Sequence, residues 1–189
     1  MLFRSPDGRI RFSPSNFFTS FKLRSDWVFL PFLGVNFCKY DKSLYASVHH
    51  KNTKKVVDYI ETNFGYEMDV LDITKNKYYD LSKSEYIIFA SGIYYGAMHK
   101  LIIEYINDTD LSGKKIILCY TCGIRYKDYV NSLGIKLNNK DAKYMGSCYC
   151  RGYDTYGFLK KIGGIAKGHP NEKDCYRVLN EIRKLIEKD

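Results

Sequence analysis

A short polar segment at residues 49–53 has side chains of the types that can bind a phosphate. Its residues are His49, His50, Lys51, Asn52 and Thr53, and a helical pattern begins at Thr53. Backbone N–H groups at a helix N-terminus bind phosphate, and hydroxyl and cationic donors strengthen the contact. A capped helix start with solvated polar side chains fits the same residues equally well. A metal site is disfavoured, because adjacent histidines on a tight turn rarely share one ion and no third ligand is evident.

Two later segments could contribute to the same site. The first has a glycine on each side of two tyrosines, and its residues are Ser91, Gly92, Ile93, Tyr94, Tyr95 and Gly96. The second is a turn made of Thr121, Cys122 and Gly123. Tyrosine gives a flat apolar surface with a polar tip, and glycine adopts backbone angles that other residues avoid. A surface loop with exposed tyrosines is the alternative for the first segment, and we favour the ligand site.

The cysteines also bear on chemistry. They are Cys38, Cys119, Cys122, Cys148, Cys150 and Cys175. Cys119 and Cys122 have CxxC spacing, and Cys148 and Cys150 have CxC spacing, which raises the alternative of a zinc site. We expect reduced thiols in a cytoplasmic protein and no metal, because these pairs lie at the ends of apolar strands and not on short knuckles. We assign Cys122 a structural role. We assign no residue of the chain a catalytic role.

Strands that alternate with helices must position these segments. Apolar runs predict strands at residues 43–48, 68–73, 85–90, 114–120 and 142–150. Helical spacing predicts helices at residues 53–64, 98–106, 126–133 and 172–188, and a loop at residues 91–99. This alternation indicates an α/β fold with an open, doubly wound, five-stranded parallel sheet and helices on both faces. Ligands of such sheets bind beyond the carboxyl ends of the strands, which is where the polar and glycine-rich segments fall.

Residues 1–40 differ from residues 41–189 and are expected to form a poorly ordered or loosely packed extension. Their apolar run at residues 27–37 contains Pro31 and is too short to span a bilayer, so no stable membrane insertion is expected. The chain carries a net charge of +9, of which +4 lies in residues 1–40. That balance favours acidic partners or anionic ligands. No basic run is long enough to indicate nucleic-acid binding.

Three stretches of this chain resemble the flavodoxin family. The segment SVHHKNTKKV at residues 47–56 resembles that family's phosphate loop, in a variant with paired histidines. The stretches GYDTYG at residues 152–157 and IGGIAKGHPNEKD at residues 162–174 are similar to its ending. His50 stands where the commonest loop has a second hydroxyl residue, and Lys51 stands where it has glycine. Lysine adopts positive φ less readily than glycine, so either the turn differs or a phosphate contact offsets the strain.

The resemblance implies strand order 2-1-3-4-5 and non-covalent binding of flavin mononucleotide (FMN). It places residues 91–96 against the isoalloxazine ring and residues 121–123 at the ring's pyrimidine side, with Asp154 and Tyr156 as weaker candidates at its edge. The function it implies is electron transfer between redox proteins, and the basic charge favours acidic partners. One alternative is an FMN-dependent NAD(P)H:quinone or flavin reductase, and another is a binding module without cofactor. The sequence shows no GxGxxG after any strand, although reductases of this fold can lack one.

Overall fold

A computed structural model describes residues 3–4, 10–11, 41–48, 50–65, 68–76 and 78–189. In the first forty residues it describes two short strands, β1 (Phe3–Arg4) and β2 (Ile10–Arg11), which pair antiparallel. The other residues of the segment 1–40 lie outside the described residues, so the expectation that this segment is poorly ordered stays a prediction. His49 also lies outside the described residues.

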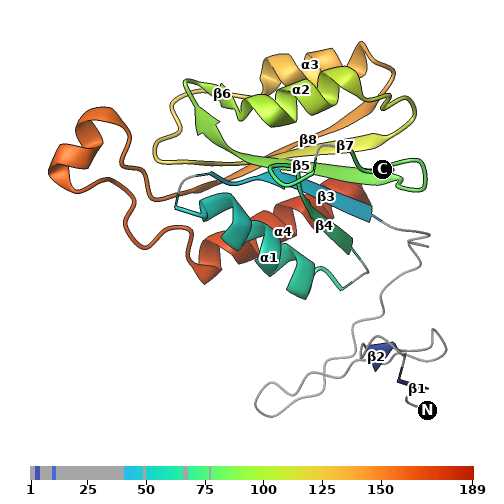
Figure 1. Ribbon diagram of the computed structural model, residues 1–189, viewed down its shortest axis with the longest axis horizontal. Coiled ribbons are helices and arrows are strands. Elements are labelled where there is room, and N and C mark those ends of the chain that lie inside the picture. Colours follow the sequence, from blue (N-terminus) through green and yellow to red (C-terminus); the bar gives the residue numbers. More distant parts are fainter. Residues whose placement is uncertain (1–2, 5–9, 12–40, 49, 66–67, 77) are drawn as a thin grey trace. The chain divides into compact units, whose positions relative to one another are not determined.

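The strands of the main unit form the predicted parallel sheet (Figure 1). They are β3 (Asp41–Ala46), β4 (Met68–Asp72), β5 (Tyr86–Tyr94), β7 (Lys115–Cys122) and β8 (Lys143–Arg151). Their spatial order is β4-β3-β5-β7-β8, which confirms the order 2-1-3-4-5 for the parallel strands. The order reverses beside β3, so its carboxyl end and that of β5 open onto the crevice where ligands of this architecture bind.

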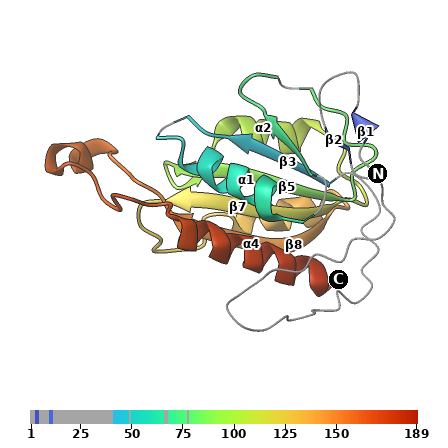
Figure 2. The same cartoon turned by 90° about the horizontal axis from the view of Figure 1, so that it is seen from below.

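Helices cover both faces of the sheet, as predicted. Figures 1 and 2 show α1 (Asn52–Asn63) and α4 (Glu172–Glu187) on one face, and α2 (Lys100–Asp108) and α3 (Asn131–Asn138) on the other. Alternate residues of β5 therefore enter different cores: Ile87 and Phe89 pack in the layer of α2 and α3, whereas Ile88 packs in the layer of α1 and α4. Burial on both faces explains why the central strands are continuously apolar.

Two local predictions were wrong, and one element was not predicted. Residues 91–99 are not a loop, because β5 continues to Tyr94 and turns back through β6 (Ala97–Met98), which pairs antiparallel with it. The third helix begins five residues later than expected, at Asn131, because Asp128 accepts a hydrogen bond from the Val130 amide and holds a turn before it. The 3-10 helix η1 (Gly157–Ile162) was not expected at all.

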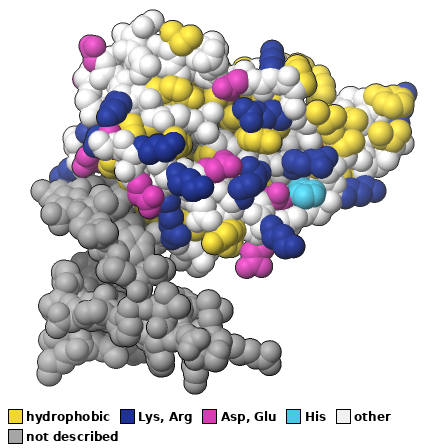
Figure 3. All heavy atoms as spheres, turned by 180° about the vertical axis from the view of Figure 1, so that it is seen from behind, with side chains coloured by type: hydrophobic (Ala, Val, Ile, Leu, Met, Phe, Trp, Pro, Cys, Tyr) yellow, Lys and Arg dark blue, Asp and Glu magenta, His cyan; other side chains and the backbone are white. Residues whose placement is uncertain are grey.

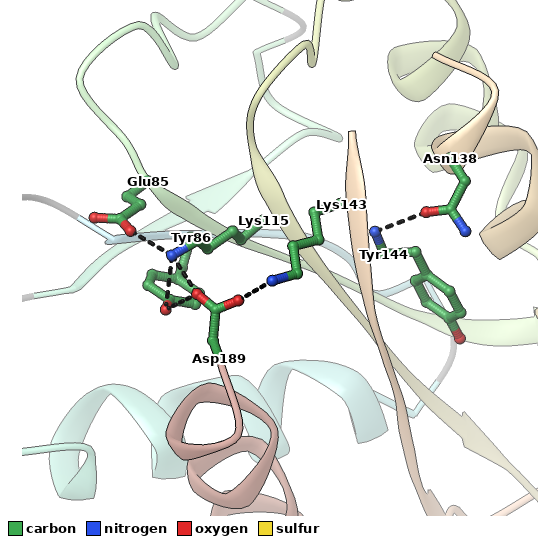
Figure 4. Close-up of polar contacts among 7 residues, drawn as sticks. All are labelled: Glu85, Tyr86, Lys115, Asn138, Lys143, Tyr144 and Asp189. Carbon is green, nitrogen blue, oxygen red and sulfur yellow. Dashed lines mark hydrogen bonds and ion pairs between the residues drawn. The ribbon is translucent and has the colours of Figure 1, made fainter. Parts of the chain in front are cut away.

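The amino end of the sheet is fastened to the end of the chain (Figure 4). Lys115 and Lys143, at the starts of β7 and β8, both form ion pairs with Asp189, and the Tyr86 hydroxyl donates to the same carboxylate at 3.0 Å. Hydrogen bonds from Lys115 and then Lys143 hold the pKa of the Asp189 carboxyl well below its usual range. These contacts lie at the opposite end of the strands from the predicted site.

Among the described residues, no helix is long and apolar enough to cross a bilayer.

Candidate functional site

A cavity of about 610 Å³ lies at the carboxyl ends of the strands. Four segments enclose it: the β3–α1 turn, the β5–β6 hairpin, the segment after β7, and the segment after β8. The sequence-predicted residues that line it are His50, Asn52, Thr53, Gly92, Ile93, Tyr94, Tyr95, Gly96, Thr121, Cys122 and Gly123. The three predicted segments therefore meet at one cavity. Two described residues from the same prediction, Lys51 and Ser91, do not line it.

The β3–α1 turn has the backbone shape that presents amide groups to an anion. His50 and Lys51 both have positive φ, at 55° and 54°, so the turn is left-handed without any glycine. Lys51 is the N-cap residue of α1, and its side chain makes no capping hydrogen bond with the described residues. The Asn171 side chain caps α4 and the His99 side chain caps α2. The first amides of α1 are thus left to bind a partner other than the cap.

Asn52 ties the turn to the segment after β8. Its Nδ2 donates to the Tyr153 carbonyl at 2.8 Å. Gly152 permits this approach, because a Cβ at that position would lie 2.7 Å from Asn52 Nδ2. Asn52 was predicted as a ligand-binding residue, and the structure shows that it also joins two walls of the cavity.

Thr53 and Thr121 join the turn to the end of β7. Their hydroxyl oxygens lie 3.1 Å apart, and the two residues are only 2% and 3% exposed. A buried hydroxyl needs a hydrogen-bond partner, and here each supplies the other's. Each hydroxyl can also serve a second partner, since it has one donor and two acceptor positions.

His50 also contacts the segment after β8. Its Nε2 lies 2.8 Å from the Thr155 hydroxyl, and its ring lies 4.6 Å from the ring of Tyr153. Lys51 does not line the cavity. Ser91 is buried and structural: its hydroxyl donates to the Gly92 carbonyl at 2.8 Å and accepts from the His99 amide at 3.0 Å, which fastens the base of the hairpin.

The β5–β6 hairpin presents the predicted tyrosines. Its tip is a two-residue turn in which Tyr95 and Gly96 both have positive φ, at 52° and 82°, which matches the twist of a tight hairpin. Tyr95 is 90% exposed, and its ring lies edge-on to that of Tyr156 at 5.4 Å. Tyr94 packs edge-on against His99 at 5.2 Å. The hairpin thus holds one tyrosine against the fold and one at the mouth of the cavity.

The end of β7 forms the cavity floor. Burial raises the pKa of the Cys122 thiol to about 11, which keeps it protonated and unreactive near neutral pH. A Cβ on Gly123 would lie 2.7 Å from the Asp154 Cβ and 2.9 Å from Ile165 Cδ1, so only glycine lets the segment after β8 close on this wall.

Cysteine placement speaks against the zinc alternative for these four thiols. Cys122 packs in the layer of α2 and α3, whereas Cys119, Cys148 and Cys150 are buried in the layer of α1 and α4. Residues at odd spacing on a strand face opposite sides of the sheet, so the four thiols cannot share one tetrahedral ion. Within the described residues, no group of three metal-ligating side chains lies together.

Sequence reasoning missed several lining residues. Tyr126, Lys127, Tyr153, Thr155 and Ile165 line the cavity without having been proposed, and Asp154 and Tyr156 were proposed only as weaker candidates. The glycines around η1 could have indicated that the chain turns back toward the cavity there. Gly163 and Gly164 have φ of 79° and 82°, so the chain turns there and brings Ile165 back to pair with Asp154.

The cavity accommodates an anionic ligand better than a second groove of the fold does. Among the described residues that line the cavity, Asp154 is the single acidic one, Lys127 balances its charge, and His50 and Asn52 add polar side chains. A groove of similar size, about 640 Å³, runs along α2 and includes none of the predicted residues. Its lining contains the carboxylates of Asp80, Glu104, Asp108 and Asp110, which would repel a phosphate.

Comparison with known proteins gives the same fold. A flavodoxin-domain family model matches residues 44–162. An uncharacterized protein of Methanocaldococcus jannaschii is 34% identical over 145 residues, covering 76% of this chain and 95% of that protein.

Among solved structures, oxidised flavodoxin 2 from Bacillus cereus matches with a TM-score of 0.56 and 17% identity, covering 78% of this chain and 99% of that one. A Fusobacterium nucleatum flavodoxin mutant bound to FMN matches with a TM-score of 0.54 and 16% identity, covering 78% and 96%. Such low identities establish the fold alone. The family match spans well over half of the chain, and the sheet has the corresponding strand order, so this chain belongs to the flavodoxin family.

Proposed function

We propose that this protein binds FMN without a covalent link and carries electrons between redox proteins. The observation that carries the proposal is the meeting of three predicted segments at one cavity, at the edge of the sheet where the strand order reverses. Its volume of about 610 Å³ lies within the range of small-molecule sites.

The residues at the start of α1 fit the phosphate. The left-handed turn at His50 and Lys51 leaves the first amides of the helix without a side-chain cap from Lys51. Thr53, whose hydroxyl lies against that of Thr121, and His50 both line the cavity from the β3–α1 turn. Helix dipole, hydroxyl and imidazole donors together suit a dianion, and Lys55 adds charge within the same helical turn.

The remaining walls fit a flat ring. Tyr94, Tyr95 and Tyr126 provide aromatic surface, and the backbone at Gly92 and Gly123 lines the same cavity. FMN, when bound, supplies the redox chemistry, and the protein positions it and sets its electrostatic surroundings. With one carboxylate in the lining, the cavity opposes negative charge on the ring less than an acidic cavity would.

A flavin titration tests the binding. Purified protein is titrated into FMN and, separately, into riboflavin, which has the same ring and no phosphate, while flavin fluorescence is recorded. We expect FMN to bind at least about a hundredfold more tightly, since the phosphate adds several charge-assisted hydrogen bonds. Equal affinity for both flavins would refute the phosphate assignment, and no affinity for either would refute the proposed function.

A second measurement separates carrier from reductase. NADPH is added under anaerobic conditions to the FMN-loaded protein without any other protein, and the flavin absorbance is followed. We expect the band to persist, because an electron carrier has no site that positions the nicotinamide of NADPH for hydride transfer to the flavin. Rapid bleaching would instead identify an FMN-dependent reductase.

A further inference from the structure

We propose that the cavity mouth and the segment after β8 form a docking surface for an acidic redox protein with an apolar centre. Residues 153–169, which contain η1, are here named the η1 arm. Figure 1 shows the η1 arm projecting beyond the carboxyl ends of the strands, next to the β5–β6 hairpin. The inference deepens the proposed function, since the surface surrounds the entrance to the cavity assigned to FMN.

The first observation is a concentration of exposed apolar side chains. Ten large hydrophobic residues are exposed among those described, and six of them lie on the η1 arm or the cavity lining. They are Tyr95, Ile124, Tyr126, Tyr156, Phe158 and Ile162, which are 58–90% exposed. Single exposed hydrophobic residues are ordinary, but a group around one opening marks an interaction site.

The second observation is that the η1 arm has a defined structure. The Tyr153 amide donates to the His169 carbonyl at 2.9 Å, and Asp154 and Ile165 exchange two backbone hydrogen bonds at 2.9 and 3.1 Å. The Tyr153 hydroxyl donates to the Gly163 carbonyl at 3.1 Å. The ring contact between Tyr95 and Tyr156 then joins the η1 arm to the hairpin. The apolar side chains are therefore presented in a fixed arrangement, which lowers the entropy cost of docking.

The third observation is the charge around these side chains. The surface carries Lys127, Lys160, Lys161 and Lys167, all of them exposed. None of these four has an ion-pair partner among the described residues, unlike Lys54, Lys115 and Lys143 elsewhere on the fold. Figure 3 shows basic side chains interspersed with hydrophobic ones toward the projecting end of the molecule.

The nearby acids do not neutralise this charge. Asp154 accepts a hydrogen bond from the Tyr156 amide at 2.8 Å, and Asp128 accepts one from the Val130 amide at 3.1 Å. Both carboxylates thus hold local turns. With four cations against these two acids, an isologous contact with a second copy would bring like charges together, whereas an acidic partner is complementary.

A binding experiment with defined probes tests the inference. The probes are an acidic two-cluster ferredoxin and, as the basic control, cytochrome c, each titrated calorimetrically into both the FMN-loaded protein and the flavin-free protein at 20 and 200 mM salt. We expect the ferredoxin to bind at least about tenfold more tightly than cytochrome c at low salt, and its affinity to fall at high salt.

Variants locate the surface. Lys160→Glu/Lys161→Glu reverses two charges on η1 outside the cavity lining, and it should weaken ferredoxin binding by about tenfold or more at low salt. Phe158→Ser removes an apolar contact without changing charge, and it should weaken binding by about fivefold at both salt concentrations. The matched control is Lys83→Glu/Lys136→Glu, on the loop before β5 and on α3, which should change the affinity less than about twofold.

Each contrary result overturns the inference. These results are failure of the ferredoxin to bind, equal binding of cytochrome c, equal loss in the η1 and control variants, or displacement of the ferredoxin by a single-stranded oligonucleotide at equal concentration, which would indicate a general polyanion surface. Flavin titration of the same variants separates the two proposals. If FMN fails to bind while the charge-dependent docking persists, only the proposed function is wrong; if FMN binds normally and docking is absent, only the docking surface is wrong.

Discussion

The hydroxyl pair of Thr53 and Thr121 gives a sharp test of how the cavity is built. Replacing either threonine with valine keeps the shape of the side chain and removes the hydroxyl. Both residues are almost fully buried, and their oxygens lie 3.1 Å apart. Each single substitution therefore leaves the other hydroxyl in the interior without this partner.

The expected magnitudes follow from that geometry. A buried hydroxyl that loses its partner costs about 1–3 kcal/mol of stability, whereas removing both partners together is close to neutral. The double variant Thr53→Val/Thr121→Val should therefore be more stable than the sum of the single effects predicts, with a coupling energy of about 1–2 kcal/mol.

Urea unfolding followed by circular dichroism gives the four stabilities of this double-mutant cycle, and flavin titration gives the matching affinities. Since Thr53 is also assigned to the phosphate, every variant with Thr53→Val should bind FMN about tenfold more weakly, the equivalent of one hydrogen bond to a charged group. Thr121→Val alone should change FMN affinity by less than about threefold, because its hydroxyl serves Thr53.

Additive stabilities, within about 0.5 kcal/mol, would show that the two hydroxyls do not depend on each other and would refute the structural reasoning. Equal losses of FMN affinity in the two single variants would show that Thr53 has no separate contact with the ligand. The two readouts thus test the packing and the ligand assignment independently.

Three further predictions concern other parts of the fold. Gly123→Ala should lower the free energy of unfolding by about 1–3 kcal/mol in urea denaturation, because its Cβ would overlap Asp154 and Ile165; an unchanged midpoint would contradict the close packing. Asp189→Asn should destabilise the protein by about 1 kcal/mol at pH 7. Lys115 and Lys143 lower the folded-state pKa of Asp189, so the stability difference between the wild type and Asp189→Asn should be complete above the unfolded pKa of about 4 and should shrink as the pH falls below it. Thermal unfolding at several pH values measures this difference. A constant difference down to pH 2 would exclude the ion pairs as its cause. Burial raises the pKa of Cys122 to about 11, so its thiol should react with iodoacetamide at pH 8 at least about tenfold more slowly in the native protein than in the unfolded protein. Peptide mass spectrometry measures the two rates. Equal rates would show that the native protein has an accessible thiolate at this position.

Much of the fold was predictable because burial leaves a clear mark on sequence. The apolar run that contains Ile87 and Phe89 indicated a strand covered on both faces, and the helical spacing of Val178, Leu179 and Ile182 indicated α4. Such patterns need only the neighbours along the chain. The strand order required the resemblance, since no local pattern specifies which strands become neighbours.

Residues 91–99 show where local reasoning failed. The glycines at Gly92 and Gly96 indicated a loop, but Gly92 pairs with Thr121 inside the sheet, and only Gly96 serves a turn. The contribution of Tyr153 and Thr155 to the cavity depends on contacts with His50 and Asn52 about a hundred residues earlier, and no short window of sequence contains that information.

The hydrogen bonds that close the base of the η1 arm make the length of the arm independent of the structure of the sheet. Because the Tyr153 amide meets the His169 carbonyl, the ends of the excursion stay together whatever lies between them. Lengthening such a closed loop costs only about 0.6 kcal/mol for each doubling. Insertions or exchanges within residues 160–162, which do not line the cavity, can therefore change the exposed surface of the arm while the cavity lining is kept, so related proteins of this fold can differ in the partners they recognise.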